Sequence, residues 1–308
     1  MMTNKNLIYI AGPTGVGKTE LSIAVAKKLN TEIISCDSRQ FFKELKIGTS
    51  PPSKKQLKDV NHHFIHNKSI HDVYNVGLYE KEATKVLTEL FYKKDNIILV
   101  GGSGLYADSI IYGIDDFPNI PAKIRDDIIK LHDSNGIEYL QNKLKSVDLE
   151  YYKKVDLKNT NRIIRALEII EFTGNTFSSY RTNTIKNRGF ESHVIIVKCE
   201  REKLYARINN RVDLMIKAGL EEEAYNLKDN KDLNTLNTVG YKEFFTYFDN
   251  KISYSEAVEK IKQNTRNYAK RQITWLKKYK NSIKINYNYD IESIFKNLNN
   301  ILWKHWKF

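Results

Sequence analysis

Short apolar runs alternate along this chain with amphipathic stretches. Four of the runs are rich in β-branched residues and predict buried strands at 7–10, 32–35, 96–100 and 194–197. Apolar residues recur at helical spacing in the stretches behind the first two of these regions, 18–29 and 78–93. Strands that alternate with helices are typical of an α/β fold with a parallel sheet.

Beyond the third strand the pattern is mainly helical. Pro118 and Pro121 break the chain, and a charged stretch with helical spacing and few strand signals follows them. Further helices are predicted at 161–170, 204–227 and 255–279 and from 238 onward, followed by a strand at 283–285 and a final amphipathic helix. Residues 43–75 are expected to be irregular. We therefore predict a core formed by 1–118 and 159–308 and a helical insertion, 119–158, that acts as a lid.

The residues directly after the first predicted strand match the pattern G-x-x-x-x-G-K-[ST]: Gly12, Pro13, Thr14, Gly15, Val16, Gly17, Lys18 and Thr19. A strand before it and a helix after it give this pattern the context of a phosphate-binding loop. Glycines let the backbone fold around an anion, so that N–H groups and the helix N-terminus point at it. Lys18 adds a positive charge, and the Thr19 hydroxyl is placed to bind a Mg²⁺ ion held by the same phosphates. We predict that the loop binds a di- or triphosphate.

Candidate site residues also follow the second and third predicted strands. Asp37 follows one of them, and Ser103 lies in the glycine-rich turn after the other. Because ligands bind at the carboxyl ends of strands in open parallel sheets, both residues are expected near the phosphate loop. The glycines of that turn indicate a close approach of the backbone to a ligand or to the phosphate loop. Asp37 either binds Mg²⁺ through water or accepts a substrate proton, or it is a helix N-cap; Ser103 either lines the site or belongs to a plain turn.

The chain is basic, with 50 Lys and Arg against 37 Asp and Glu and a formal net charge of +13. Such an excess fits a polyanionic partner, but an AT-rich genome also favours the joint abundance of Lys, Asn, Ile and Tyr seen here. The placement of the charges is more informative. In the helix predicted at 255–279, Lys262, Arg266 and Lys270 step by four, and no acid occurs between Glu259 and Asp290. This favours a positive ridge for a phosphate backbone over a solvated face, in which acids are normally interleaved.

Other residue types argue against several protein classes. No window approaches the ~18 apolar residues of a membrane span, and the N-terminus lacks a signal-peptide pattern. Cys36 and Cys199 lie far apart and fit small buried residues in a reducing cytoplasm. His62, His63 and His66 lack regular ligand spacing, which favours ordinary loop histidines over a metal site. We expect a cytoplasmic protein that does not associate with membranes.

Seven blocks of sequence, in their order along the chain, resemble the tRNA dimethylallyltransferase family: 12–19, 37–40, 47–49, 101–106, 162–168, 239–243 and 269–275. A phosphate loop alone is weak evidence for any family, but seven ordered blocks are specific. The resemblance implies an α/β fold with a P-loop NTPase-like parallel sheet flanked by helices. A small helical insertion domain and a helical C-terminal part complete the expected architecture. We expect the protein to be a monomer.

The family transfers a dimethylallyl group from its diphosphate to N6 of the adenosine at tRNA position 37, which is 3′-adjacent to the anticodon, and releases diphosphate. By resemblance, Lys18, Thr19 and Mg²⁺ would stabilise the leaving diphosphate, and Asp37 would accept the N6 proton. Arg207 and Arg211 would assist at the diphosphate. The target base would have to leave the anticodon-loop stack to reach the allyl carbon.

The family pattern also implies a set of tRNA contacts: Asp37, Ser38, Arg39, Gln40, Ser103, Arg125, Asn161, Arg162, Arg165, Gly240, Tyr241, Lys242, Lys270, Arg271, Gln272, Thr274 and Trp275. Arg162 and Arg165 are three apart and share a helix face. From spacing alone, that face either is solvated beside Glu168 or holds phosphate.

Two other enzyme classes share the phosphate loop: P-loop kinases of small molecules and isopentenyltransferases that act on free adenine nucleotides. Neither has a use for a basic ridge over 262–278, which argues for a macromolecular acceptor. A basic RNA-binding protein with a vestigial loop is a third alternative. The presence of Lys18, Thr19 and Asp37 argues against it.

Overall fold

The structure is a computed structural model that describes residues 5–182, 184–292 and 294–296. The chain divides into two compact units, one formed by Met1–Ile111 with Arg188–Phe308 and the other by Tyr112–Asn187. In the region of the final amphipathic helix predicted from the sequence, residues 291–292 and 294–296 are helical, and residues 297–308 lie outside the described residues.

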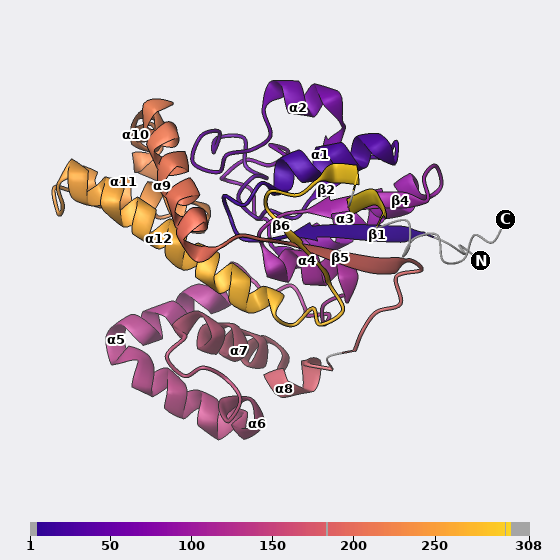
Figure 1. The fold of residues 1–308 in the computed structure, drawn as a ribbon. Helices are drawn as coiled ribbons and strands as arrows, with labels where there is room; N and C mark the ends of the chain where they lie inside the picture. Colours follow the sequence, from indigo (N-terminus) through magenta and orange to yellow (C-terminus); the bar gives the residue numbers. More distant parts are fainter. Residues whose placement is uncertain (1–4, 183, 293, 297–308) are drawn as a thin grey trace. The chain divides into compact units, whose positions relative to one another are not determined.

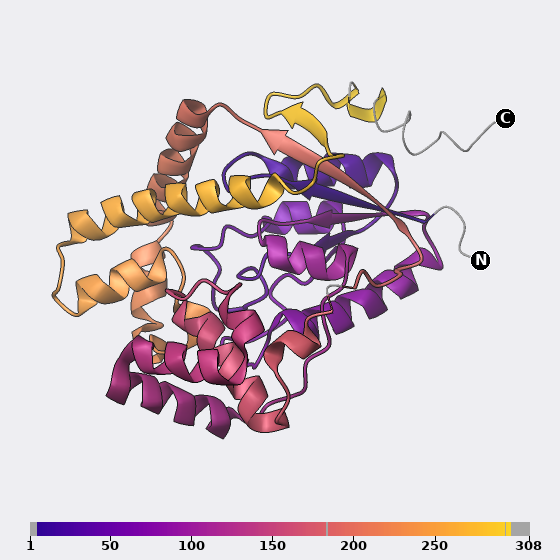
Figure 2. The ribbon, with the colours of Figure 1, turned by 90° about the horizontal axis from the view of Figure 1, so that it is seen from below.

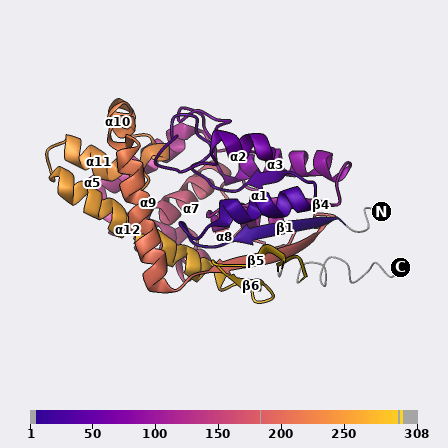
Figure 3. The same cartoon turned by 45° about the horizontal axis from the view of Figure 1, so that its top comes forward.

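The described part of the first unit contains a six-stranded sheet: β1 (Asn6–Ala11), β2 (Ile33–Ser35), β3 (His62–His63), β4 (Asn96–Val100), β5 (Glu191–Lys198) and β6 (Ile283–Asn286). The strand order is β3-β2-β4-β1-β5-β6, and every pair is parallel. Figure 3 shows β1, β5 and β6 side by side. The sheet confirms the predicted α/β class and all five predicted strands, whereas β3 falls in the stretch expected to be irregular.

The register of the central strands aligns their carboxyl ends. Ile10 near the end of β1 pairs with Val100 at the end of β4, and Ser35 at the end of β2 pairs with the same Val100. Leu7 and Ile8 of β1 are fully buried, as expected for a central strand covered on both faces. The loops that follow these three strands therefore begin side by side at one edge of the sheet.

The helices of the first unit are α1 (Lys18–Lys28), α2 (Lys54–Asp59), α3 (Val76–Phe91), α4 (Gly104–Ile111), α9 (Arg201–Lys217), α10 (Leu220–Tyr225), α11 (Tyr241–Phe248) and α12 (Tyr254–Leu276). Two short 3-10 helices, η1 (Lys228–Asn230) and η2 (Asn234–Leu236), lie between α10 and α11. Helices α1 and α3 pack on the sheet, and α9–α12 pack on one another on the side where β1 ends (Figure 1). Figure 2 shows α12 running from this group back to the sheet, where β6 follows.

Local signals explain where several helices begin and end. Helix α1 begins after Gly17, whose φ of 101° lies in the left-handed region that glycine adopts at little cost. The predicted helix at 204–227 is divided into α9 and α10 by Gly219, with a φ of 97°. Helix α2 begins with a capping box between Ser53 and Gln56, a signal present in the sequence of a stretch expected to be irregular.

The second unit is helical and contains α5 (Ala122–Val147), α6 (Leu149–Tyr152), α7 (Thr160–Thr173) and α8 (Phe177–Tyr180). It is larger than the predicted insertion, 119–158, because α7 packs against α5. Leu140 and Leu144 of α5 share an apolar cluster with Ile163 and Leu167 of α7. As predicted, Gly174 ends α7, with a left-handed φ of 72°.

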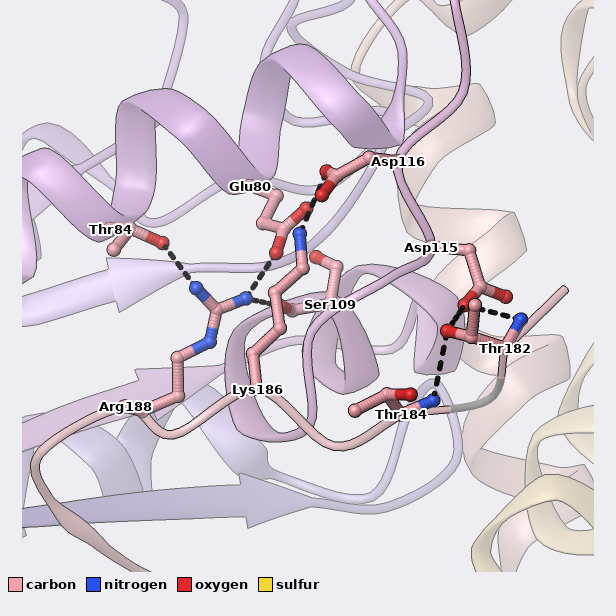
Figure 4. Close-up of polar contacts among 9 residues, drawn as sticks. All are labelled: Glu80, Thr84, Ser109, Asp115, Asp116, Thr182, Thr184, Lys186 and Arg188. Atoms are coloured by element: carbon pink, nitrogen blue, oxygen red, sulfur yellow. Dashed lines mark hydrogen bonds and ion pairs between the residues drawn. The ribbon is translucent and has the colours of Figure 1, made fainter. Parts of the chain in front are cut away.

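Arg188 begins the second segment of the first unit and is anchored there (Figure 4). Its guanidinium forms an ion pair with Glu80 of α3 and donates to the main-chain oxygen of Ser109 of α4 at 2.6 Å. Both charged side chains are about one-tenth exposed, and pairing offsets the desolvation of two buried charges. This contact ties the return of the chain to α3 and α4.

Within the second unit, the entering and leaving segments are tied to each other (Figure 4). Asp115 accepts hydrogen bonds from the Thr182 hydroxyl at 2.8 Å and from its amide at 3.1 Å. Lys186 forms an ion pair with Asp116 at 2.9 Å.

In the described part of the chain, no helix has the length and apolar character needed to span a membrane.

Candidate active site

The phosphate-loop motif adopts the strand–loop–helix arrangement expected from its sequence. Gly15 and Gly17 take left-handed φ values of 78° and 101°. A side chain at Gly12 would place its Cβ only 3.0 Å from the main-chain oxygen of Val197, so the loop passes close to β5. The Lys18 ammonium donates to the main-chain oxygen of Pro13 at 2.9 Å, across the loop. The motif thus has the compact backbone that anion binding needs.

Helix α9 brings two arginines to this loop. Arg207 Nε donates to the main-chain oxygen of Gly15 at 2.7 Å. Arg211 Nη1 lies 3.4 Å from the Thr14 hydroxyl oxygen, and its Nε donates to Ser50 Oγ at 3.0 Å. Burial lowers the pKa of the Arg211 guanidinium. The placement of both arginines beside the loop fits the predicted role at a diphosphate.

Lys18 and Asp37 form the charged centre of the site. Burial lowers the pKa of Lys18 to about 8; the Asp37 carboxylate opposes this shift, and Arg211 adds to it. Asp37 Oδ1 accepts from the Arg39 amide at 3.1 Å in a tight turn. The N-cap interpretation of Asp37 is wrong, since no helix begins at this turn. The carboxylate is half-buried and lines the cavity described below.

The glycine-rich turn after β4 lies directly against the residues after β2. A Cβ at Gly101 would lie 2.6 Å from Cys36 and 2.8 Å from the amide nitrogen of Asp37, so only glycine fits. Ser103 Oγ accepts from the Ser38 amide at 3.0 Å and donates to the Ser38 hydroxyl at 2.9 Å. The turn was predicted to approach a ligand or the phosphate loop; its first glycine instead approaches the residues after β2. Ser103 links two loops instead of closing a plain turn.

Helix α12 docks on the same turn through its inner face. Gln272 is 6% exposed; its Oε1 accepts from the Thr14 amide at 2.8 Å, and its Nε2 donates to the main-chain oxygen of Gly102 at 2.9 Å. Gly104 leaves room for the ring of Trp275, which would clash with any side chain there. Two residues predicted to contact tRNA thus have distinct surroundings, because Gln272 is buried and Trp275 is 38% exposed.

Glu223 of α10 is a residue that the sequence analysis missed. Its carboxylate accepts from the amides of Ile47 and Gly48 at 2.9–3.0 Å and from the Tyr241 hydroxyl at 2.7 Å. Tyr241 is fully buried, and a Cβ at Gly48 would lie 2.7 Å from its ring. Glu223 and Tyr241 therefore hold the loop that contains the 47–49 block. Glu223 stands in an acidic run that is typical of a solvated helix face, so no sequence signal distinguishes it.

A cavity of about 300 Å³ joins these elements within the first unit. Its lining includes polar residues near the phosphate loop and an apolar wall from α9, α10 and α12: Thr14, Asp37, Ser38, Arg39, Gly48, Thr49, Ile208, Arg211, Val212, Met215, Leu220, Thr238, Gly240, Lys242, Ile261, Tyr268 and Arg271. Such a combination of convergent polar groups and apolar walls is typical of a small-molecule site. Tyr268, which the sequence analysis also missed, is half-buried next to Asp37, whose charge adds to the effect of burial in raising the tyrosine pKa.

Several predicted tRNA contacts have roles within the protein. Arg39 Nη1 donates to the main-chain oxygen of Thr235 at 3.1 Å, and Gln40 Nε2 donates to those of Thr49 and Ser50 at the same distance. The amide of Gly240 donates to Glu243 in the first turn of α11. These contacts order the loops around the cavity.

The outer face of α12 is basic, but its ridge is not continuous as predicted. Lys270 and Arg271 are exposed, and with Thr274, Trp275 and Lys278 they line a shallow depression. Lys262 is different, since its ammonium pairs with Asp213 of α9 at 2.9 Å and with Glu259 at 3.2 Å. The prediction is wrong at Lys262 because the acid that neutralises it comes from another helix. 

Four predicted tRNA contacts lie in the second unit. Arg125 and Arg165 both pair with Glu168, at 2.9 Å and 2.5 Å, and the Glu168 side chain is 3% exposed. Arg162 and Asn161 are exposed. The buried carboxylate thus holds two guanidiniums in place.

The three histidines take part in local contacts. His62 Nδ1 lies 2.8 Å from the main-chain oxygen of Val60, and His63 Nε2 lies 2.8 Å from Glu32. Burial lowers the pKa values of His62 and His66, which favours their neutral forms. Within the described residues, no three His, Cys, Asp or Glu side chains are grouped as metal ligands.

Comparison with known proteins identifies the family. The sequence profile of a family described as IPP transferase matches residues 40–279. The chain belongs to the IPP transferase family. A tRNA dimethylallyltransferase from Flavobacterium psychrophilum is 50% identical over 299 residues, which cover 95% of this chain and 97% of that protein. One from Christiangramia forsetii is 52% identical over 272 residues, which cover 88% and 90%.

Solved structures of the family share the fold. The full-length tRNA isopentenylpyrophosphate transferase of Bacillus halodurans is 33% identical, with a TM-score of 0.69 over 98% of this chain and 96% of that one. A eukaryotic dimethylallyltransferase acting on tRNA is 25% identical, with a TM-score of 0.81 over 99% and 81%. The family members thus match nearly the whole chain, including the phosphate loop that precedes residue 40.

Proposed function

We propose that this protein transfers the dimethylallyl group of dimethylallyl diphosphate to N6 of the adenosine at tRNA position 37, with release of diphosphate. Membership of the IPP transferase family supports a prenyl-transferring enzyme. The observation that carries the proposal is the cavity that joins the phosphate loop at Thr14, the Asp37 carboxylate and an apolar wall. The cavity has a phosphate loop to bind the diphosphate, an apolar wall to pack against a short hydrocarbon, and the Asp37 carboxylate to accept a proton.

The diphosphate end of the substrate is matched by positive charge. As the allylic C–O bond breaks, its electron pair goes to the leaving diphosphate, whose negative charge grows. Lys18 and Arg211 lie at the phosphate loop and are held there before the reaction starts. Preorganised donors of this kind usually supply the largest part of such a rate enhancement.

The residues of the loop also fit a Mg²⁺ ion bound together with the diphosphate. Mg²⁺ commonly takes one or two protein oxygens and completes its coordination with phosphate oxygens and water. Thr19 lies in the first turn of α1, and Asp37 provides a carboxylate near Lys18, so oxygen donors of the right kind are present. When bound, the ion would neutralise charge on the leaving group.

The acceptor end of the reaction falls to Asp37. The allyl carbon becomes cationic as the leaving group departs, so the weakly nucleophilic N6 amine attacks it and a C–N bond forms. N6 then carries an extra proton, which Asp37 accepts. The half-buried carboxylate lines the cavity, and its charge interacts with that of Lys18.

The partner proposed for the exposed part of the site is the anticodon stem-loop of tRNA. Lys270, Arg271 and Trp275 on the outer face of α12 combine positive charge with an exposed aromatic ring. This combination suits phosphates and unstacked bases. We further propose that the protein acts as a monomer in the cytoplasm.

A direct assay tests the proposal. The protein and Mg²⁺ are incubated with unmodified tRNA and labelled dimethylallyl diphosphate, and parallel reactions contain labelled ATP or free AMP. We expect label on the adenosine beside the anticodon. Label on AMP alone would assign the protein to the free-nucleotide transferases, and ATP turnover without prenyl transfer would assign it to the kinases.

The role of Asp37 is tested with Asp37→Ala. Without a proton acceptor, transfer should fall below detection. The tRNA Kd should stay within about twofold, because Asp37→Ala removes no positively charged group that could contact a tRNA phosphate. The matched control, Asp232→Ala, removes an exposed carboxylate outside the cavity and should retain transfer. A loss of tRNA affinity as large as the loss of transfer would contradict the role of Asp37 as base.

A further inference from the structure

Gln272 connects two loops of the candidate site from a helix whose opposite face is exposed and basic. Its carboxamide is buried between the phosphate loop and the turn after β4, with one end on the Thr14 amide and the other on the main-chain oxygen of Gly102. Thr14 and Gln272 are 258 residues apart in sequence. The family resemblance predicts a tRNA contact for Gln272, but this geometry places its amide inside the protein.

The contact fixes the outermost part of the phosphate loop, Thr14 and Gly15. From α9, Arg207 holds the main-chain oxygen of Gly15, and Arg211 lies beside the Thr14 hydroxyl. Gln272 supplies the acceptor for the Thr14 amide from α12. If that acceptor were lost, the amide would have to turn or recruit water, because a buried unpaired N–H group is unfavourable.

The chemistry of the side chain fits this place. A carboxamide offers an acceptor to Thr14 and a donor to Gly102 without carrying charge. A carboxylate in the same position would put negative charge beside an anion-binding loop and would face the carbonyl oxygen of Gly102. Gly102 in turn must lack a side chain, since a Cβ there would overlap Gln272.

We propose that Gln272 is a positioning residue that holds Thr14 and Gly15 in the geometry that binds diphosphate. The helix whose outer face is proposed to bind tRNA thereby also sets the shape of the diphosphate site. The inference rests on the proposed function for its substrate, but its direct consequence is affinity for diphosphate itself. Gln272 acts through Thr14 and touches no reacting atom.

The first experiment measures binding of inorganic diphosphate with Mg²⁺ by titration calorimetry. Gln272→Met keeps the length of the side chain and removes both hydrogen bonds. Gln263→Met is the matched control, because it makes the same change at an exposed position of α12. We expect Gln272→Met to raise the diphosphate Kd about 10- to 100-fold, the usual range for one or two lost buried hydrogen bonds. The tRNA Kd should match that of Gln263→Met, whereas the melting temperature should be lower, because the Thr14 amide and the Gly102 oxygen lose their partner.

A second variant gives a readout that a merely structural role would not produce. Gln272→Glu is isosteric, and burial raises the pKa of a carboxyl group. When protonated, its O–H can donate to Gly102 and its carbonyl oxygen can accept from Thr14, as the amide does. Its diphosphate Kd is compared with that of the unmodified protein at the same pH. At pH 8 the Kd of the variant should be more than 10-fold higher, and near pH 5.5 the two values should agree within about threefold.

The outcomes separate the two proposals. If the unmodified protein transfers no label to tRNA, the proposed function is wrong, but the diphosphate titrations still decide the role of Gln272. A diphosphate Kd for Gln272→Met equal to that of Gln263→Met overturns the inference. So does a selective loss of tRNA affinity, which would make Gln272 an RNA contact. A joint loss of stability and of both affinities, without recovery of Gln272→Glu at low pH, also overturns it.

Discussion

Helices α9 and α7 each carry two arginines on one face, and Arg207 and Arg211 of α9 have different surroundings from Arg165 of α7. On α9, Arg207 and Arg211 lie against the phosphate loop and contact its main chain and the Thr14 hydroxyl. On α7, Arg165 is paired with the buried Glu168. Within the described residues, neither Arg207 nor Arg211 forms an ion pair, so their positive charge remains available to an anion.

The spacing of arginines along a helix therefore does not predict which groups they contact. The two arginines of each pair lie three or four residues apart and therefore on one face of their own helix. This spacing is compatible with phosphate binding and with a solvated face. The difference comes from the partner. A carboxylate in contact with a guanidinium neutralises it and fixes its position, whereas a main-chain oxygen fixes its position and leaves its charge.

The largest expected effect is the loss of Arg211. Arg211→Met should lower kcat/KM for dimethylallyl diphosphate about 10²–10³-fold, because one charged donor to the leaving group is removed. The check is steady-state kinetics at saturating tRNA. Arg165→Met should change this parameter much less and act mainly through the second unit. Equal losses in the two variants would erase the distinction between the pairs.

The pH dependence of the same site gives the next effect. Burial lowers the pKa of Lys18 to about 8, so the free enzyme loses this positive charge as the pH rises through 8. On the basic limb, kcat/KM for dimethylallyl diphosphate should fall about tenfold per pH unit. Arg211 contributes to the lowered pKa, and Arg211→Met should therefore shift this limb to higher pH. A limb that stays at the same pH in the variant would show that Arg211 does not act on Lys18.

The same shift has the opposite sign for folding. Below pH 8 Lys18 is charged in both the folded and the unfolded chain, and its burial lowers the stability of the folded chain. Between pH 8 and the ordinary value of 10.5, the unfolded chain binds more protons, so this group contributes a gain in stability as the pH rises.

A smaller effect is expected in the second unit. Glu168→Gln leaves Arg125 and Arg165 without their carboxylate and should lower the free energy of unfolding by about 1–3 kcal/mol. This is below the range for fully buried pairs, because both arginine side chains are 41% exposed and reach water. Hydrogen exchange should show faster opening in 112–187. Protection there equal to that of the unmodified protein would mean that Glu168 holds neither arginine in place.

The smallest effect concerns the outer face of α12. Lys270→Ala should reduce the salt dependence of tRNA affinity by about 0.7–0.9 units of logarithmic slope, the value for one lost phosphate contact. Lys262→Ala should leave the slope nearly unchanged, because Asp213 and Glu259 already neutralise Lys262. Filter binding over a range of salt concentrations measures both slopes. Equal reductions of the slope in the two variants would support the continuous basic ridge that was predicted from the sequence.

Five of the six strands, the phosphate loop and the edge of the sheet at which the site is built were predictable from the sequence. Buried strands are visible as β-branched runs, and parallel strands must end on the same side, so Asp37, Ser103 and the phosphate loop were expected together. The glycine after β4 was also readable, because only glycine allows two backbones to approach so closely.

Which polar groups face one another could be known only from the folded chain. Periodicity records that one face of a helix is apolar, but it does not identify the element that covers the polar face. Asp213 of another helix forms an ion pair with Lys262. Glu223, which belongs to a run of acids, accepts a hydrogen bond from a loop that is distant in sequence. Gln272 belongs to a basic helix, but its side chain is buried against the phosphate loop. These partners are far apart in sequence, and hydrogen bonds and ion pairs act over a few ångströms. Their pairing exists only once the chain has folded.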